Sequence, residues 1–345
     1  MTTTASTTPT RALRAGLIGL GSMGRNHART LASLPGVNFV AVCDPARDAA
    51  GAALGRSVVG SVEDLVRAGL DYCVVAAPTG LHEAIGLQLA DAGVHMLVEK
   101  PVAGDSAAAG RLVEAFARAG LVGAVGHIER YNPALQSLKA RLESGDLGEI
   151  YQIATRRQGP FPARIADVGV ALDLATHDLD LTAFVTGERY VSISARTAYK
   201  SGRAHEDLIA ATGTLSRGTV ANHLVNWLSP QKERVTIVTG ERGTFTASTL
   251  TGDLTFAANG TVESVWDDVA HFRGVSEGDV IRYALAKPEP LRVEHEAFRD
   301  AVLGDPKAPI VPLDGGLAAV AVAEAIIASA RSGDTVTVRT AVATG

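Results

Sequence analysis

The 345-residue sequence predicts an α/β domain followed by an α+β domain, namely a doubly wound parallel-sheet domain and then a domain with a mostly antiparallel sheet. Three observations lead to this prediction. Short apolar runs alternate with helix-period stretches from Leu13 to about Gly126, which is the pattern of βαβ units. From about Glu149 the pattern changes to alternating strands separated by short turn signals. The chain also exceeds the usual size of one hydrophobic core.

Composition and charge favour a soluble, cytoplasmic globular protein. Hydrophobic residues make up 46% and the formal net charge is −5, which argues against a nucleic-acid partner because phosphate binding needs clustered Lys and Arg. Residues 1–12 are polar and lack the apolar region of a secretory signal, so we expect a disordered tail. The apolar segment GGLAAVAVAEAIIASA carries Glu324 and is short for a membrane span, which favours a core helix. Cys43 and Cys73 fall in predicted buried strands, as expected of reduced thiols.

The elements of the first domain, residues 13–126, follow one another in strict alternation. The predicted strands cover residues 14–20, 37–44, 71–78, 95–101 and 121–127. The predicted helices between them cover residues 25–34, 61–69, 81–93 and 106–120. Several of these helices end in glycine, a common residue just past a helix C-terminus. Such an alternation forms right-handed βαβ units on a parallel sheet.

The first turn of this domain reads GLGSMG, with Gly19, Gly21 and Gly24 between a strand and a helix. Dinucleotide binding needs these glycines for a tight turn, for the approach of backbone N–H groups to a pyrophosphate, and for close strand–helix packing. The N-terminus of the following helix adds a favourable field for phosphates. A tight turn alone could use the same residues, so it is the flanking strand and helix that favour a nucleotide site.

Asp44 ends the second predicted strand, near the offset of about 20 residues at which a carboxylate accepts the ribose hydroxyls of NAD and repels a 2′-phosphate. We therefore predict NAD rather than NADP. Arg47 nearby could accept a 2′-phosphate, which keeps NADP as the less favoured alternative. Asp44 could also cap a helix over PARDAAGAAL, and the two roles are compatible.

Two further motifs stand at the carboxyl ends of predicted strands, where ligands of open α/β sheets bind. In AAPTGLH, Pro78 and Thr79 could line the nicotinamide ribose, or Thr79 could cap the next helix. In VEKP, Glu99 and Lys100 precede a proline that favours extended backbone. A lysine at this place can hydrogen-bond a substrate hydroxyl and favour its alkoxide character. Without the glycine turn earlier in the sequence, Lys100 would be interpreted as an ordinary surface lysine.

The segments GLIGLGSMGRNHA, APTGLH, GVHMLVEKPVA and DLATHDLD, in this order and spacing, resemble the glucose-fructose oxidoreductase/inositol dehydrogenase family, Gfo/Idh/MocA. The resemblance spans nearly the whole chain. It implies a Rossmann domain, a second domain with a large open sheet, and oxidation or reduction of a sugar or cyclitol hydroxyl with a tightly held nicotinamide cofactor. It also implies a cis Lys100–Pro101 bond, with Lys100, Asp173 and His177 as the catalytic residues. The expected cofactor contacts are Gly19, Gly21, Ser22, Met23, Gly24, Asp44, Ala77, Pro78, Thr79, His82, Glu99 and Lys100.

The stretch ALDLATHDLDL places charge within an apolar segment. On a helix at about 100° per residue, Asp173, His177 and Asp180 fall within about 60° of one another, whereas Asp178 points elsewhere. A histidine is well suited to take a hydroxyl proton near neutral pH, so His177 would be the base and Asp173 would orient its ring. Lys100 would hold the substrate oxygen. We expect no metal here, because a zinc site needs three or four protein ligands and no second histidine has the spacing.

The second domain, residues 127–345, is expected to contain strands at 149–157, 190–199, 207–215, 218–227 and 233–240. Helices near 294–304 and 315–333 and an edge strand at 335–339 would complete it. The helix with Asp173 and His177 would cover one face of the sheet, and the other face must be covered by something. Family members often cover it with a second subunit, so we expect a homodimer or homotetramer.

The segments VGHIERYNPAL and RRQGPFPARIADVGVALDLATHDLD resemble family members that oxidise the 3-hydroxyl of a nucleotide sugar, especially UDP-N-acetylglucosamine. A diphosphate favours nearby arginines, for which Arg156 and Arg157 are also candidates. The residues expected to bind the substrate are Lys100, Arg130, Tyr131, Asn132, Arg164, Asp173 and His177. Other nucleotide sugars, glucose, glucose 6-phosphate and inositols remain alternatives, as do a keto-sugar reductase and a non-enzymatic NAD-binding regulator.

Overall fold

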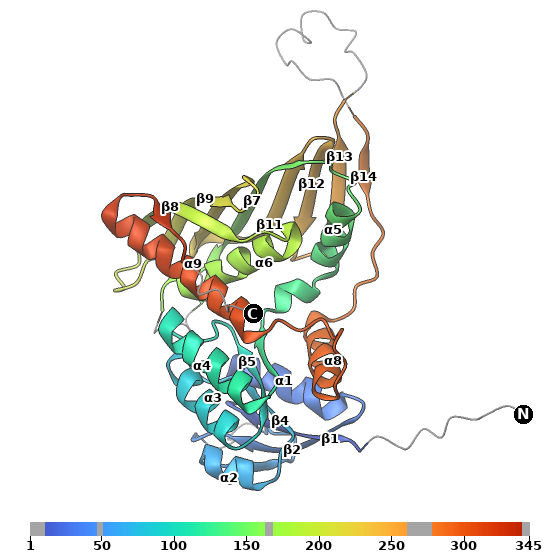
Figure 1. The fold of residues 1–345 in the computed structure, drawn as a ribbon, viewed down its shortest axis with the longest axis vertical. Helices are drawn as coiled ribbons and strands as arrows, with labels where there is room; N and C mark the ends of the chain where they lie inside the picture. The colour runs from blue at the N-terminus through green and yellow to red at the C-terminus, as the bar shows by residue number, and fades with distance from the viewer. Residues whose placement is uncertain (1–10, 47–50, 163–167, 261–277, 340–345) are drawn as a thin grey trace, which may run out of the picture. The chain divides into compact units, whose positions relative to one another are not determined.

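The computed structural model describes residues 11–46, 51–162, 168–260 and 278–339 (Figure 1). The chain divides into two compact units. The first unit runs to Gly126 and also includes residues 291–316, and the second comprises residues 127–290 and 317 onward. The break at 126/127 coincides with the predicted domain boundary. Residues 291–316, which the sequence prediction assigns to the second domain, belong to the first unit instead.

The first unit is built on a parallel sheet with six strands in the described residues, in the order β3-β2-β1-β4-β5-β6. The five predicted strands and four predicted helices are present, and the predicted doubly wound domain is confirmed. The prediction lacked the short edge strand β3. The elements are β1 (Leu13–Ile18), α1 (Ser22–Ser33), β2 (Val37–Cys43), β3 (Ser57–Val59), α2 (Val62–Arg67), β4 (Tyr72–Val75), η1 (Thr79–Leu81), α3 (His82–Asp91), β5 (His95–Glu99), α4 (Ser106–Ala119) and β6 (Gly123–Gly126).

The core of the first unit follows from its apolar strands. Every residue of β4 is buried, as expected where helices cover both faces of a parallel sheet. Cys43 and Cys73 are buried free thiols, and burial raises the pKa of both. The helix considered for residues 45–54 is absent from its described part, where residues 52–55 form a turn, and Arg47 lies outside the described residues.

Residues 291–316 belong to the first unit because they contact its sheet. Helix α8 (Pro290–Val302) packs against it through an aromatic side chain, and the segment after α8 forms a backbone hydrogen bond with it. The ring of Phe298 packs edge-on against Tyr72 of β4, with centroids 5.4 Å apart. The backbone N–H of Val125 in β6 donates to the carbonyl of Val311 at 2.8 Å. The C-terminal part of the sequence therefore supplies part of the core of the N-terminal domain.

The second unit is built on a sheet with nine strands in the described residues, in the order β14-β13-β12-β11-β7-β10-β9-β8-β15. Its pairings are antiparallel, which confirms the prediction, except that β10 pairs parallel with β7. The unpredicted strands β12 to β14 extend one edge, and β15 lies at the other, near the predicted edge strand. The elements are η2 (Ile128–Tyr131), α5 (Pro133–Glu143), β7 (Ile150–Pro160), η3 (Ala171–Ala175), α6 (Thr176–Thr186), β8 (Tyr190–Ala198), β9 (Leu208–Leu215), β10 (Val220–Asn226), β11 (Leu228–Gly240), β12 (Gly243–Ser248), β13 (Asp253–Ala258), β14 (Val280–Arg282), α9 (Leu313–Ser332) and β15 (Val336–Thr337).

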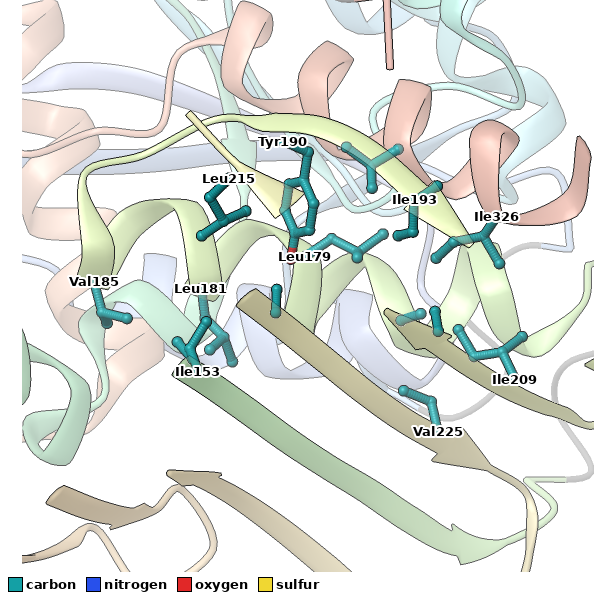
Figure 2. Packing of buried hydrophobic residues seen from close by; sticks show 14 of the residues in the cluster. Ile153, Leu179, Leu181, Val185, Tyr190, Ile193, Ile209, Leu215, Val225 and Ile326 are labelled. Atoms are coloured by element: carbon teal, nitrogen blue, oxygen red, sulfur yellow. The ribbon is translucent and has the colours of Figure 1, made fainter. Parts of the chain in front are cut away.

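One face of this sheet is covered and the other is open in the single chain. Buried and exposed residues alternate along β9, as they do in a strand with one face in the core. Figure 2 shows that Ile153 of β7 and Val225 of β10 lie on the side of the sheet where Leu179 and Leu181 of α6 pack. An apolar layer therefore helps to hold helix α6 against the sheet.

Helix α9 is long and apolar enough for a membrane span by length and composition alone. However, 56% of its most apolar window is buried inside the structure. Val322, Ala323 and Ile326 belong to the core of the second unit, and Figure 2 shows Ile326 close to Ile209 of β9. The helix packs as the predicted core helix.

Candidate functional site

The glycine turn after β1 has the geometry that a dinucleotide site requires. Gly19 has φ +95°, and a Cβ on it would lie 2.5 Å from the carbonyl oxygen of Ala76. A Cβ on Gly24 would lie 2.0 Å from the carbonyl oxygen of Gly19, so the helix can approach the turn only with glycine there. A Cβ on Gly21 would meet no atom within 4 Å. The first and third glycines are thus required by the fold, while the second borders open space at the start of α1.

Asp44 links the end of β2 to this turn. Its Oδ2 accepts a hydrogen bond from the backbone N–H of Leu20 at 2.7 Å, and its Oδ1 accepts one from Ala46 at 2.8 Å. Each carboxylate oxygen can accept more than one hydrogen bond, so both retain capacity for ribose hydroxyls. Asp44 therefore fits the predicted ribose position, and in addition it fixes the loop that carries the glycines.

Glu99 and Lys100 lie at the carboxyl end of β5, and the Lys100–Pro101 bond is cis, as the family resemblance implied. The Glu99 Oε2 accepts a hydrogen bond from the backbone N–H of Lys100 at 3.2 Å. The buried ring of His82 lies between two carbonyl oxygens, with Nδ1 2.9 Å from Pro101 O and Nε2 2.9 Å from Ala77 O. His82 therefore ties the end of β4 to the segment after β5, and burial lowers its pKa.

The predicted cofactor residues of the first unit gather at the carboxyl edge of its sheet. Strand order reverses between β1 and β4, which is the position at which doubly wound sheets bind dinucleotides. The glycine turn, the N-terminus of α1 and the carboxylate of Asp44 together fit a pyrophosphate and a ribose. Around them, Ser22 and Met23 begin α1, and Ala77, Pro78 and Thr79 follow β4.

Asp173 of the second unit lies in η3, a π-helical turn that runs directly into α6. The carboxylate of buried Glu206 accepts the backbone N–H of Ala171 at 2.9 Å and fixes the start of this turn. A Cβ on Gly169 would lie 2.0 Å from the same carboxylate, so this approach needs glycine. Asp173 is 5% exposed, and His177, in the first turn of α6, is half-buried. Short π-helical segments are frequent at functional sites.

A buried ion network lies between α6 and the sheet, and the sequence prediction did not contain it. The Nε of Arg157 on β7 donates to Asp178 at 3.0 Å, and its Nη1 donates to Glu129 at 2.8 Å. Burial opposes the charge of Arg157, but the two carboxylates outweigh it and raise its pKa. At Asp178 the balance is the opposite. Burial raises the pKa of this carboxyl more than Arg157 lowers it, and the pKa rises to about 6. Asp178, next to His177 in sequence, is thereby anchored to the sheet.

Arg234 of β11 is a further member of this network. It pairs in register with Arg157, and its Nη1 lies 3.5 Å from Glu129. Its side chain is 38% exposed, whereas that of Arg157 is 2% exposed. Burial and Arg157 lower its pKa, and Asp173 is among the charges that act in the opposite direction. Arg234 is thus a basic residue of this network that sequence patterning missed, because cross-strand register brings it beside Arg157.

The other predicted substrate residues have structural partners. Arg130 forms a bidentate pair with Asp180, with Nε to Oδ2 at 2.9 Å and Nη2 to Oδ1 at 2.6 Å. Asn132 caps α5 by accepting from Ala134 N at 3.0 Å, and Tyr131 is buried. Arg164 lies outside the described residues.

Side chains alternate between the two faces along β7, so Arg156 lies on the face opposite Arg157. There it pairs with Glu233. It is therefore not on the face that α6 covers. In the part of the chain that the structure describes, no three His, Cys, Asp or Glu side chains are placed to hold a metal ion.

The parallel sheet with its strand-order reversal and glycine turn places the first unit in the class of dinucleotide-binding domains. Comparison with protein families makes the class specific. Residues 13–127 match the model described as oxidoreductase family, NAD-binding Rossmann fold, and residues 135–246 match the GFO/IDH/MocA C-terminal domain. The chain belongs to the Gfo/Idh/MocA oxidoreductase family.

Curated relatives carry two kinds of name. A UDP-N-acetylglucosamine 3-dehydrogenase of Acidithiobacillus ferrooxidans is 36% identical over 61% of this chain and 66% of the relative. Inositol 2-dehydrogenase 2 of Saccharopolyspora erythraea is 33% identical over 56% of this chain and 59% of the relative. Both matches span less than two thirds of the relative's length. An inositol 2-dehydrogenase of Rubrobacter xylanophilus is 31% identical over 92% of this chain and 91% of the relative.

Solved structures agree with this assignment. The UDP-N-acetylglucosamine 3-dehydrogenase of Acidithiobacillus ferrooxidans has a TM-score of 0.79 at 27% identity, covering 93% of this chain and 98% of that one. The WlbA dehydrogenase of Bordetella pertussis, in complex with NADH and UDP-GlcNAcA, has a TM-score of 0.78 at 27% identity, covering 95% and 99%. The fold of the family therefore extends over both units.

Proposed function

We propose that the protein is an NAD-dependent dehydrogenase that oxidises a ring hydroxyl of a sugar, at C3 of a nucleotide sugar such as UDP-N-acetylglucosamine. The observation that carries this proposal is Lys100 at the carboxyl end of β5, on the same sheet edge as a glycine turn and Asp44 that fit a dinucleotide. Family membership supports the oxidoreductase class.

The proposed chemistry assigns one role to each residue. Lys100 holds the substrate oxygen and stabilises the negative charge that develops on it. His177 takes the hydroxyl proton, and Asp173 orients the imidazole ring. When bound, NAD supplies the hydride acceptor. The carboxylate of Asp44 disfavours a 2′-phosphate, which supports NAD over NADP.

The nucleotide-sugar substrate is supported by relatives named for UDP-N-acetylglucosamine oxidation. Arg234, which is half-exposed beside Glu129, could meet an anionic part of such a substrate. An inositol is the second candidate, because the inositol 2-dehydrogenase of Rubrobacter xylanophilus matches 92% of this chain. Both substrates present a secondary ring hydroxyl, so the same three catalytic residues would serve either.

The test is a panel of UDP-sugars, sugar phosphates and inositols with NAD or NADP, followed by NADH absorbance. We expect turnover with a UDP-sugar and NAD. Lys100→Met and His177→Asn should each lower kcat by about 100- to 10,000-fold, the usual contribution of a positioned acid or base. The matched control is Lys307→Met, because Lys307 is an exposed lysine of the first unit. Wild-type turnover in Lys100→Met would refute the assigned chemistry. Turnover with inositols alone would refute the nucleotide sugar as substrate and favour the inositol instead.

We also propose that the protein acts as a cytoplasmic homo-oligomer paired through the open face of the second unit's sheet. That face carries Leu224, Val235 and Ile237, which are only partly buried in the single chain. Light scattering should give a dimer or tetramer mass. An Ile237→Lys variant should shift that mass to the monomer, and a monomeric wild-type protein would refute the pairing.

A further inference from the structure

The first unit contains a cluster of titratable side chains that the proposed reaction does not use. His27 comes from α1, Glu99 from the end of β5, and Glu294 and His295 from α8. His27, Glu294 and His295 are each 1% exposed. The side chain of Glu99 is 12% exposed, so it alone reaches the sheet edge that carries Lys100. The cluster thus runs from the interior to the proposed cofactor site.

Hydrogen bonds join three of these side chains in a line. The Nδ1 of His27 lies 2.8 Å from Nε2 of His295, and the Nε2 of His27 lies 2.9 Å from Oε1 of Glu99. An ionised carboxylate only accepts hydrogen bonds, so His27 must donate from Nε2. In a neutral His27 ring, Nδ1 then accepts from the Nε2–H of His295. The donors all point one way, from His295 through His27 to Glu99.

The charges around the line are consistent with an ionised Glu99 at its end. Burial alone would raise the pKa of Glu99, but the hydrogen bond that His27 donates and the nearby charge of Lys100 help to lower it overall. Burial keeps His295 neutral by lowering its pKa well below the usual value. Burial and nearby Glu99 raise the pKa of Glu294 well above its usual value, which favours the protonated form of this side chain. Glu99 is therefore the carboxylate of the cluster that keeps its negative charge.

The end of β5 lies in the half of the sheet that receives the nicotinamide. In doubly wound sheets, each half beside the strand-order reversal binds one mononucleotide of the cofactor, and Asp44 marks the adenosine half. Glu99 ends β5, which lies in the other half of the sheet, two strands from β1. The nicotinamide ring is positively charged when oxidised and neutral when reduced, so a fixed carboxylate nearby interacts differently with the two forms.

We propose that His27, supported by His295, is a positioning residue that fixes the Glu99 carboxylate at the cofactor edge, so that this carboxylate favours oxidised over reduced nicotinamide. This inference rests on the proposed NAD-dependent function. His27 belongs to the helix that opens at the glycine turn, and Glu99 also accepts the N–H of Lys100. One buried line of hydrogen bonds therefore connects the α1 side of the cofactor site with the backbone of the proposed catalytic lysine.

The test measures the dissociation constants of the full-length protein for NAD⁺ and NADH by calorimetry, without substrate. In Glu99→Gln we expect the ratio of NADH to NAD⁺ dissociation constants to fall by about tenfold, which is the effect of one unit charge at a distance of about 12 Å and an effective dielectric constant of about 20. His27→Phe should shift the ratio in the same direction. His27→Gln, which keeps an N–H donor toward Glu99, should restore most of it. His95→Gln is the control, because His95 lies on the same strand and contacts Val122 instead.

Each outcome decides the inference. If Glu99→Gln weakens both forms equally, the carboxylate supports the fold without discriminating redox state, and the inference is wrong. If Glu99→Gln shifts the ratio but His27→Phe does not, His27 is not the positioning residue. Should the wild-type protein bind neither form, the proposed function fails as well, whereas binding of both with an unchanged ratio in the variants rejects only this inference. Circular dichroism of every variant verifies that the fold is retained.

Discussion

Replacement of Arg157 should show how strongly the buried network holds the second unit together. The guanidinium has donors 2.8 Å from Glu129 and 3.0 Å from Asp178, and all three side chains are at most 7% exposed. Arg157→Met keeps much of the apolar volume but leaves two buried carboxylates, with Arg234 3.5 Å from Glu129 as the remaining cation. Loss of one partner of a buried pair costs about 3–5 kcal/mol. Because two carboxylates lose their partner here, we expect the upper part of that range.

The assay is equilibrium unfolding in urea followed by tryptophan fluorescence, since Trp227, one of the two tryptophans of the sequence, is buried in the second unit. Arg282→Met is the matched control, because Arg282 also lies 3.0 Å from a carboxylate, that of Asp253, but its side chain is 70% exposed. We expect the control to cost about 0–1 kcal/mol. The expected difference is a large part of the about 5–15 kcal/mol that stabilises a typical domain.

A triple variant separates lost ion pairs from lost packing. Arg157→Met combined with Glu129→Gln and Asp178→Asn removes the buried charges together, so most of the lost stability should return. If Arg157→Met unfolds within about 1 kcal/mol of Arg282→Met, the carboxylates have found water or another partner, and the reasoning from burial is wrong.

Three further experiments test other parts of the first unit. Gly24→Ala should destabilise it by about 1–3 kcal/mol, because the new Cβ would lie 2.0 Å from the carbonyl oxygen of Gly19, whereas Gly21→Ala should keep wild-type stability and weaken NAD binding in calorimetry. Equal urea midpoints for the two variants would contradict this. Asp105→Ala should cost about 1 kcal/mol in urea unfolding, because the carboxylate accepts Ala108 N at the start of α4, and no loss would refute the cap. Glu294→Gln should remove a pH dependence of the free energy of unfolding. The pKa of Glu294 in the folded protein lies above the ordinary 4.5, so the wild-type protein loses stability as the pH rises from 4.5 toward the folded pKa. The loss is up to about 1.4 kcal/mol per pH unit. Parallel stability–pH curves for wild type and Glu294→Gln would reject that assignment.

The sequence allowed the local elements of the first unit to be predicted because each apolar run and helix repeat is strong by itself. β3 was missed, since three residues are too short to display a period. The return of residues 291–316 to the first unit could not be inferred, because it depends on packing between residues as distant as Tyr72 and Phe298. The predicted mostly antiparallel sheet of the second unit is confirmed, but the parallel pairing of β10 with β7 could not be inferred, because two other strands lie between them in the sequence.

The candidate site shows the same division between local and distant information. Gly19, Gly24 and Asp44 could be assigned because a turn and its spacing define their environment. The role of Asp178 could not be derived, since its partner Arg157 lies on a strand and only the folded sheet brings them together. The expected helical face also assumed a regular α-helix, whereas Asp173 lies in a π-helical turn.

The contribution of residues 291–316 to the first unit has a consequence for synthesis of the protein. When Gly126 leaves the ribosome, the parallel sheet still lacks Phe298 against Tyr72 and the backbone bond from Val125 to Val311. Domains generally fold as units during translation. This one cannot be completed until the chain up to residue 316 has emerged, after strands β7 to β14 of the other unit. Until then, the nascent N-terminal segment exposes the apolar surface that residues 291–316 later cover. Chaperones and proteases would act at this surface first.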